Sequence, residues 1–191
     1  MIRQGRIGDE SGIANVHVES WKSTYKGLVP DSFLDSLSAE KRNPVWKKQL
    51  ESNSIFVAEE NGQIVGFASY GKERTSKHPF YKGELYAMYL LAEHQRKGIG
   101  KALMHKIAQE LANQHIHTML TWAFEQNGAC QFYEALGGKR IDRAEVVIEG
   151  TSLSEVAFGW DTLKFVRQLS GQIFFFTVNC LVGIKRKDDL P

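Results

Sequence analysis

Cysteine is scarce in this chain: only Cys130 and Cys180 occur among 191 residues, and they are not in C-x-x-C spacing. This excludes a disulfide-stapled scaffold and favours a protein of the reducing cytoplasm. A large excess of positive or negative charge is also lacking, because the formal net charge is +2 and no long basic run occurs. We therefore expect no nucleic-acid partner. No apolar run is long enough to span a bilayer, and the polar residues 1–5 do not indicate a signal peptide.

What the chain does contain is typical of one globular domain. Hydrophobic residues make up 42% and charged residues 24% of the sequence, which is enough apolar material for a core. We find no internal repeat and no linker. Periodicity and turn residues predict strands at 1–6, 54–59, 63–70, 84–91, 116–122, 139–149 and 152–163, and helices at 9–24, 31–37, 43–51, 99–111 and 127–136.

Two helix starts carry recognisable capping residues. Asp9 is the expected N-cap of the first helix. Asn43 is the expected N-cap of the third, with Pro44 at the first helical position, where a missing N–H costs nothing.

The stretch 84–111 joins a buried strand to an amphipathic helix. Residues 84–91 are apolar toward both faces, so we expect both faces of this strand to be covered. In the helix, Ile99, Leu103, Ile107 and Leu111 recur at every fourth position and form one buried stripe. The chemistry is expected in the turn between the two elements.

That turn, 95–100, places Gly98 and Gly100 at a helix start. Each glycine costs about 1 kcal/mol relative to alanine, so something should compensate. Without Cβ atoms, the N–H groups of the turn can converge on an anion, and the helix dipole and the charges of Arg96, Lys97 and Lys101 add to the attraction. The turn therefore predicts a phosphate-binding loop; a tight turn without a ligand is the alternative.

Three phosphate-loop patterns can be compared with this turn. A P-loop is excluded because Gln95 stands at its first glycine and Ala102 at its Ser/Thr position. A dinucleotide fingerprint is excluded because Leu103 stands where the third glycine is needed. The pattern Arg/Gln-x-x-Gly-x-Gly/Ala is matched by Gln95, Gly98 and Gly100. It resembles the acetyl-CoA motif of the GNAT superfamily of N-acetyltransferases.

The resemblance covers residues 1 to about 169 and implies the fold of that family. We expect an α/β domain with a mixed, mostly antiparallel central sheet of about seven strands, helices on both faces, and a splay between strands 4 and 5. The tail 170–191 is apolar and β-prone. It could be an extra strand, a dimer contact or a terminus foreign to the domain, so a homodimer stays open.

The resemblance also implies acetyl-CoA as the cosubstrate, with loop amides on its pyrophosphate and the fourth strand on its pantetheine arm. A backbone amide of that strand could hold the thioester oxygen. The residues assigned in this way to cofactor binding are Met88, Tyr89, Leu90, Gln95, Arg96, Lys97, Gly98, Ile99, Gly100, Lys101 and Asn127.

Acetyl transfer to an amine requires a neutral nucleophile, and a lysine-like amine costs about 4 to 5 kcal/mol to deprotonate at pH 7. A carboxylate can accept that proton directly or through water. Glu84 opens the fourth strand, where several family members place such a base, although it could be an exposed strand-end residue. Glu59 and Glu125 are weaker candidates, and ordered water alone is a further alternative.

The run 127–137 resembles the family motif N-x-x-A-x-x-F-Y-E-x-x-G. Its apolar spacing turns Tyr133 inward, and in many family members this tyrosine is proposed to protonate the leaving thiolate. Asn127 could bind the pantetheine arm or cap the helix. Catalytic candidates are thus Tyr133 and Glu84.

The segment 20–30 looks like the helix pair that lines the acceptor side in one bacterial subset of the family. Trp21 and Tyr25 are its candidate substrate-binding residues, or else plain core residues one helical turn apart. His115 and His117 lack a third ligand with suitable spacing, so we expect no metal. The sequence thus predicts transfer of an acetyl group to a primary amine of a small molecule or protein; a non-catalytic acyl-CoA-binding module is the alternative.

Overall fold

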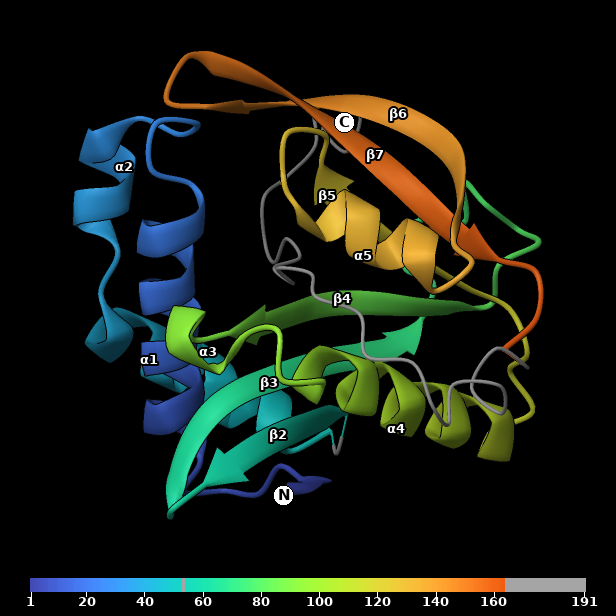
Figure 1. Cartoon of the computed structure of the whole chain (residues 1–191), viewed down its shortest axis with the longest axis horizontal. Helices are drawn as coiled ribbons and strands as arrows, with labels where there is room; N and C mark the ends of the chain where they lie inside the picture. The colour runs from blue at the N-terminus through green and yellow to red at the C-terminus, as the bar shows by residue number, and fades with distance from the viewer. Residues whose placement is uncertain (53, 164–191) are drawn as a thin grey trace.

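The computed structural model describes residues 1–52 and 54–163, which form a seven-stranded sheet flanked by helices (Figure 1). The strand order is β1-β2-β3-β4-β5-β7-β6, and only β4 and β5 pair in parallel. The predicted tail 170–191 and the boundary at 169 lie outside the described residues. The strands are β1 (Ile2–Gln4), β2 (Ile55–Glu60), β3 (Gln63–Lys72), β4 (Gly83–Leu90), β5 (Met119–Phe124), β6 (Lys139–Ile148) and β7 (Thr151–Trp160).

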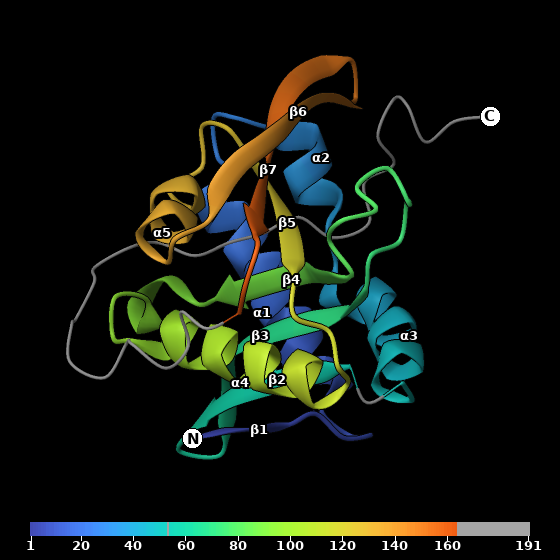
Figure 2. The same ribbon diagram turned by 90° about the vertical axis from the view of Figure 1, so that its right-hand side faces the viewer.

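Two groups of helices cover the two faces of this sheet, as the α/β prediction required (Figures 1 and 2). The larger core lies under α4 and α5, and a second core lies under α1, α2 and α3 and reaches the β6–β7 hairpin. None of the helices in the described ranges has the length and apolarity needed to cross a membrane. The helices are α1 (Glu10–Thr24), α2 (Asp31–Ser36), α3 (Ala39–Leu50), η1 (Ala92–His94), α4 (Ile99–Asn113) and α5 (Ala129–Ala135).

β4 and β5 separate soon after they meet in the middle of the sheet. Their register covers three residue pairs, from Gly83 opposite Met119 to Leu85 opposite Thr121. Beyond that point β4 continues beside β3, whereas β5 continues beside β7. The predicted splay between strands 4 and 5 is confirmed, and it divides the sheet into two halves.

The third helix begins earlier than the sequence suggested. α3 starts at Ala39, and the Ser38 hydroxyl accepts a hydrogen bond from the Lys41 N–H. Pro44 therefore lies inside the helix, where its missing N–H removes one intrahelical bond. The predicted start at Asn43 was wrong because the serine cap upstream already satisfies the helix terminus.

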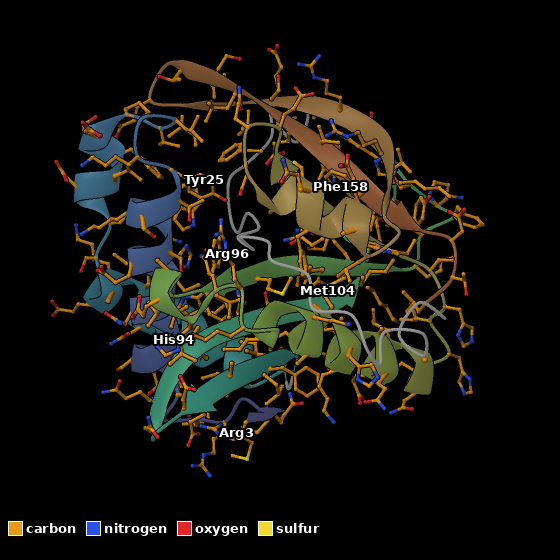
Figure 3. All side chains as sticks on the ribbon, viewed as in Figure 1. Arg3, Tyr25, His94, Arg96, Met104 and Phe158 are labelled. Carbon is orange, nitrogen blue, oxygen red and sulfur yellow. The ribbon has the colours of Figure 1, made fainter. Side chains whose placement is uncertain are left out.

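Asp9 precedes α1 as predicted, but its side chain does not cap the helix. Its carboxylate instead accepts hydrogen bonds from Arg3 Nη1 at 2.6 Å and Arg3 Nη2 at 2.8 Å. The Arg3 guanidinium holds the pKa of this carboxyl below its ordinary value. A charged partner on β1, labelled in Figure 3, thus outcompetes the backbone amides and ties the edge of the sheet to α1.

His17 is a fully buried imidazole in the middle of α1. Its ring stacks on Tyr89 with centroids 5.1 Å apart and meets Trp46 edge-on at 5.5 Å. Neither ring nitrogen has a hydrogen-bond partner among the described residues. Burial lowers the pKa of His17 to about 3, so the folded protein holds this side chain neutral.

This burial predicts a stability that falls with acid. Between pH 6.5 and pH 3 the unfolded chain binds a proton at His17 that the folded protein does not bind, so stability drops as pH falls. From pH 7 to pH 5 this group should cost about 2 kcal/mol of unfolding free energy. His17→Phe should lack that part of the pH dependence. Urea unfolding of both proteins at the two pH values checks this; equal pH dependence would contradict the neutral assignment.

Candidate active site

The turn between β4 and α4 is the one that the sequence predicted as a phosphate-binding loop. Arg96 and Gly98 both adopt left-handed conformations, with φ of 61° and 81°. A Cβ added at Gly98 would meet nothing within 4 Å, so the backbone at this glycine is open to a ligand. The first N–H groups of α4 follow directly, and such groups have no partner within a helix. The residues present therefore fit a bound phosphate.

The end of β4 leads into this turn beside the divergence from β5. Leu91 N–H donates to Val65 O on β3 at 3.0 Å, so strand alternation turns the backbone groups of Met88 and Leu90 to the other side, toward the divergence. Leu90 O accepts hydrogen bonds there from Gln95 Nε2 at 3.1 Å and Ser20 Oγ at 3.0 Å. Gln95 thus anchors the turn to the strand.

The predicted acceptor residue Trp21 lies in the core. Its side chain is 1% exposed, and its Nε1–H donates to the Tyr89 hydroxyl at 2.8 Å. Of the two interpretations open from the sequence, the burial favours the core residue. With Ser20, Trp21 fastens α1 to two successive residues at the end of β4.

Tyr25 and Asn127 are brought together from opposite halves of the sheet. Asn127 Nδ2 donates to the Tyr25 hydroxyl at 3.1 Å, and Asn127 Oδ1 accepts from the Ala129 N–H at 2.9 Å. Asn127 therefore caps the start of α5 and braces the end of α1 at the same time. Figure 3 shows Tyr25 at the end of α1 and Arg96 in the turn after β4.

Tyr133 faces inward from α5, as its spacing predicted, and is 0% exposed. Its ring contacts Phe132 edge-on at 5.4 Å, Phe158 at 5.6 Å and Trp160 edge-on at 5.8 Å between centroids. An aromatic cage from α5 and β7 thus fixes the position of this side chain.

Glu84 is not the exposed strand-end residue that the sequence left open as an alternative. Its carboxylate accepts hydrogen bonds from Arg74 Nε at 3.1 Å, from Arg74 Nη2 at 2.5 Å and from the Arg74 N–H at 3.2 Å. The weaker candidates are engaged elsewhere: Glu59 accepts from Arg3 at 2.7 Å, and Glu125 from Arg143 at 2.8 Å.

Sequence reasoning missed Arg74 and Ser20 as residues of this region. Arg74 lies in a polar connection without periodicity, and its pairing with a strand residue ten positions later leaves no pattern in the sequence. Ser20 lies in a helix where a buried serine has no distinctive spacing. Across residues 1–52 and 54–163, no group of three or more His, Cys, Asp or Glu side chains could hold a metal ion.

The split sheet with a glycine turn at the α4 N-terminus is the arrangement expected of a GNAT acetyltransferase. The family model described as acetyltransferase (GNAT) family matches residues 17–138, and the chain belongs to this family. It is therefore an acetyl-CoA-dependent N-acetyltransferase. Its relatives are named as acyltransferases, which does not support the non-catalytic alternative.

Relatives agree with this assignment over most of the chain. The uncharacterized N-acetyltransferase YuaI of Bacillus subtilis (strain 168) is 39% identical over 169 residues, which cover 88% of this chain and 96% of the relative. The L-amino acid N-acyltransferase MnaT of Escherichia coli (strain K12) is 31% identical over 138 residues, covering 71% and 77%. The structure of yncA from Salmonella typhimurium, solved with acetyl-CoA, has a TM-score of 0.65 at 22% identity, covering 85% and 93%.

Proposed function

We propose that this enzyme transfers an acetyl group from acetyl-CoA to a primary amine by direct attack in a ternary complex. The observation that carries the proposal is the divergence of β4 and β5 after three residue pairs, directly beside the glycine turn of α4. A split of this kind gives an extended thioester a path along β4, with its phosphates at the helix N-terminus.

On the cofactor side of the site, acetyl-CoA would be held by backbone groups and by positive charge. Residues 96–101 would hold the pyrophosphate through N–H groups and the positive end of the α4 dipole. The backbone of Met88 and Leu90 would hold the pantetheine arm, and Asn127 would border it. Gln95 supports this arrangement indirectly, because its hydrogen bond to Leu90 O joins the turn to the strand.

The acceptor is proposed to enter from the α1 face, because Glu84, the proposed base, faces that side whereas Leu85 packs under α4. Glu84 on β4 would border its path, and Tyr25, buried like Trp21, would shape that path through its hydrogen bond with Asn127. Trp21 is proposed to act by holding Tyr89 on β4, since its ring is buried. MnaT is named for L-amino acids, which makes amino acids the first acceptors to try.

The acceptor nitrogen must lose two protons in all, and the leaving sulfur must gain one. The amine nitrogen attacks the thioester carbon, a C–N bond forms and the C–S bond breaks. Before this attack, the acceptor's ammonium group loses a proton, for which Glu84 is the proposed acceptor, directly or through water. The departing thiolate gains a proton, for which the Tyr133 hydroxyl is the proposed donor. The second proton, which the nitrogen loses once it carries the acetyl group, restores that hydroxyl.

Release of free coenzyme A thiol tests the proposal. With acetyl-CoA and a panel of primary amines, we expect thiol release that depends on the amine and stays linear at a rate above the amine-free control. Mass spectrometry should find one acetyl group on the amine. Ping-pong kinetics, or an acetylated protein formed without amine, would contradict direct transfer.

A further inference from the structure

Arg74 and Glu84 form an ion pair on the face where the acceptor is proposed to enter. Leu85 packs into the core under α4, so strand alternation turns Glu84 to the opposite face. The Glu84 side chain is 2% exposed, whereas that of Arg74 is 46% exposed. The pair therefore presents its cation to the surface and keeps its anion behind it.

The Arg74 guanidinium is held in place before any acceptor arrives. It lies 4.2 Å above the centroid of the Tyr86 ring, and the Tyr86 hydroxyl in turn donates to Lys72 O at 2.7 Å. The two hydrogen bonds to Glu84 fix its plane from behind. A guanidinium fixed in this way loses little freedom when it binds an anion, which favours specific recognition.

The connection 73–82, which carries Arg74, is fastened to the other half of the sheet. Tyr81 Oη donates to Asp161 Oδ1 at 3.0 Å just after β7, and His78 Nε2 lies 3.2 Å from Asp142 Oδ2 on β6. Within the connection, the Glu73 carboxylate accepts from the N–H groups of Thr75 and Ser76. Arg74 therefore belongs to a bridge between the two halves.

The same connection has an excess of positive charge. Glu73 is the one acidic residue between positions 72 and 82, and it is turned inward onto the connection's own amides. The basic residues in that span are Lys72, Arg74, Lys77 and Lys82. This excess attracts an acceptor with a negative group and disfavours a polycation such as a polyamine.

We propose that the acceptor carries a carboxylate close to its amino group, as an amino acid does, and that Arg74 binds this carboxylate. The inference rests on the proposed function for the place of the acceptor. One zwitterion would then meet both members of the pair: its carboxylate lies on Arg74, and its ammonium is attracted by Glu84. Arg74 would thus determine which amines are acetylated.

Matched acceptors test the proposal on the unaltered enzyme. Free L-amino acids and the corresponding amino acid amides differ in the carboxylate while keeping the same amine carbon skeleton. We expect kcat/KM to be about tenfold or more higher for the free acids, the range for a hydrogen bond to a charged group. Amides that react as well as the acids, or reaction with spermidine or peptide lysines alone, would overturn the assignment of Arg74 and leave the proposed function intact.

A variant then assigns the preference to one side chain. Arg74→Met should raise KM for the free acid about tenfold and abolish the preference over the amide, while acetyl-CoA affinity remains. Arg74→Lys should restore part of the preference. Lys77→Met removes one positive charge from the same connection and should lower the preference far less than Arg74→Met does. A preference that survives in Arg74→Met overturns the proposal; absence of thiol release with every amine contradicts the proposed function as well.

Discussion

Tyr133→Phe is expected to lower kcat by about 10²- to 10⁴-fold, the usual range for loss of one general acid. Phenylalanine keeps the ring, so the contacts with Phe132, Phe158 and Trp160 should survive. Affinity for acetyl-CoA, measured by calorimetry, should barely change. Only the hydroxyl is removed, so a loss confined to kcat points to proton transfer to the departing thiolate.

Tyr70→Phe is the matched control for this experiment. Tyr70 is a buried tyrosine of the same core, stacked on Phe56 with centroids 5.7 Å apart, and it has no proposed part in the reaction. Its variant should keep full kcat. An effect of less than tenfold at Tyr133 would reduce that residue to a packing role, because a coenzyme A thiolate can leave without help. Loss of both kcat and cofactor affinity would instead assign the hydroxyl to the pantetheine arm.

Gly98→Val is expected to weaken acetyl-CoA binding at least tenfold, which corresponds to about 1.4 kcal/mol. A Cβ added at this position meets no protein atom within 4 Å. It does occupy the place proposed for the pyrophosphate. It also strains a backbone with φ of 81°, so the cost in stability must be separated from the cost in binding.

Gly62→Val makes that separation. Gly62 lies in the hairpin between β2 and β3, has φ of 78°, and a Cβ there also meets nothing within 4 Å. The two variants should lose similar stability in thermal unfolding, and only Gly98→Val should lose affinity in calorimetry. Equal affinities in both folded variants would show that the turn after β4 does not hold the phosphates.

The elements around the site could be predicted because their signals are local and strong. The stripe from Ile99 to Leu111 on α4, the two glycines of the turn and the inward spacing of Tyr133 all lie within short stretches of sequence. The splay between the fourth and fifth strands was expected from the resemblance to the GNAT family.

The features that sequence reasoning missed are of two kinds. Some depend on contacts between residues distant in the chain, and others on two groups that compete for the same side chain. Arg74 and Glu84 are joined only when β3 and β4 pair and bring the 73–82 connection back over the strand. Asp9 could cap α1, but Arg3 on a neighbouring strand binds its carboxylate more strongly. Such outcomes depend on three-dimensional neighbours, which periodicity does not report.

The early separation of β4 and β5 leaves two strand edges facing each other in the interior of a sheet. Strand edges are where foreign chains add and aggregation begins, and most proteins keep them short or charged. Here the edges face inward, with α1, α4 and α5 around them, so a second protein molecule cannot easily align with either. A narrow, extended ligand can lie between the two edges. In this enzyme the thioester arm would take the position of a missing strand.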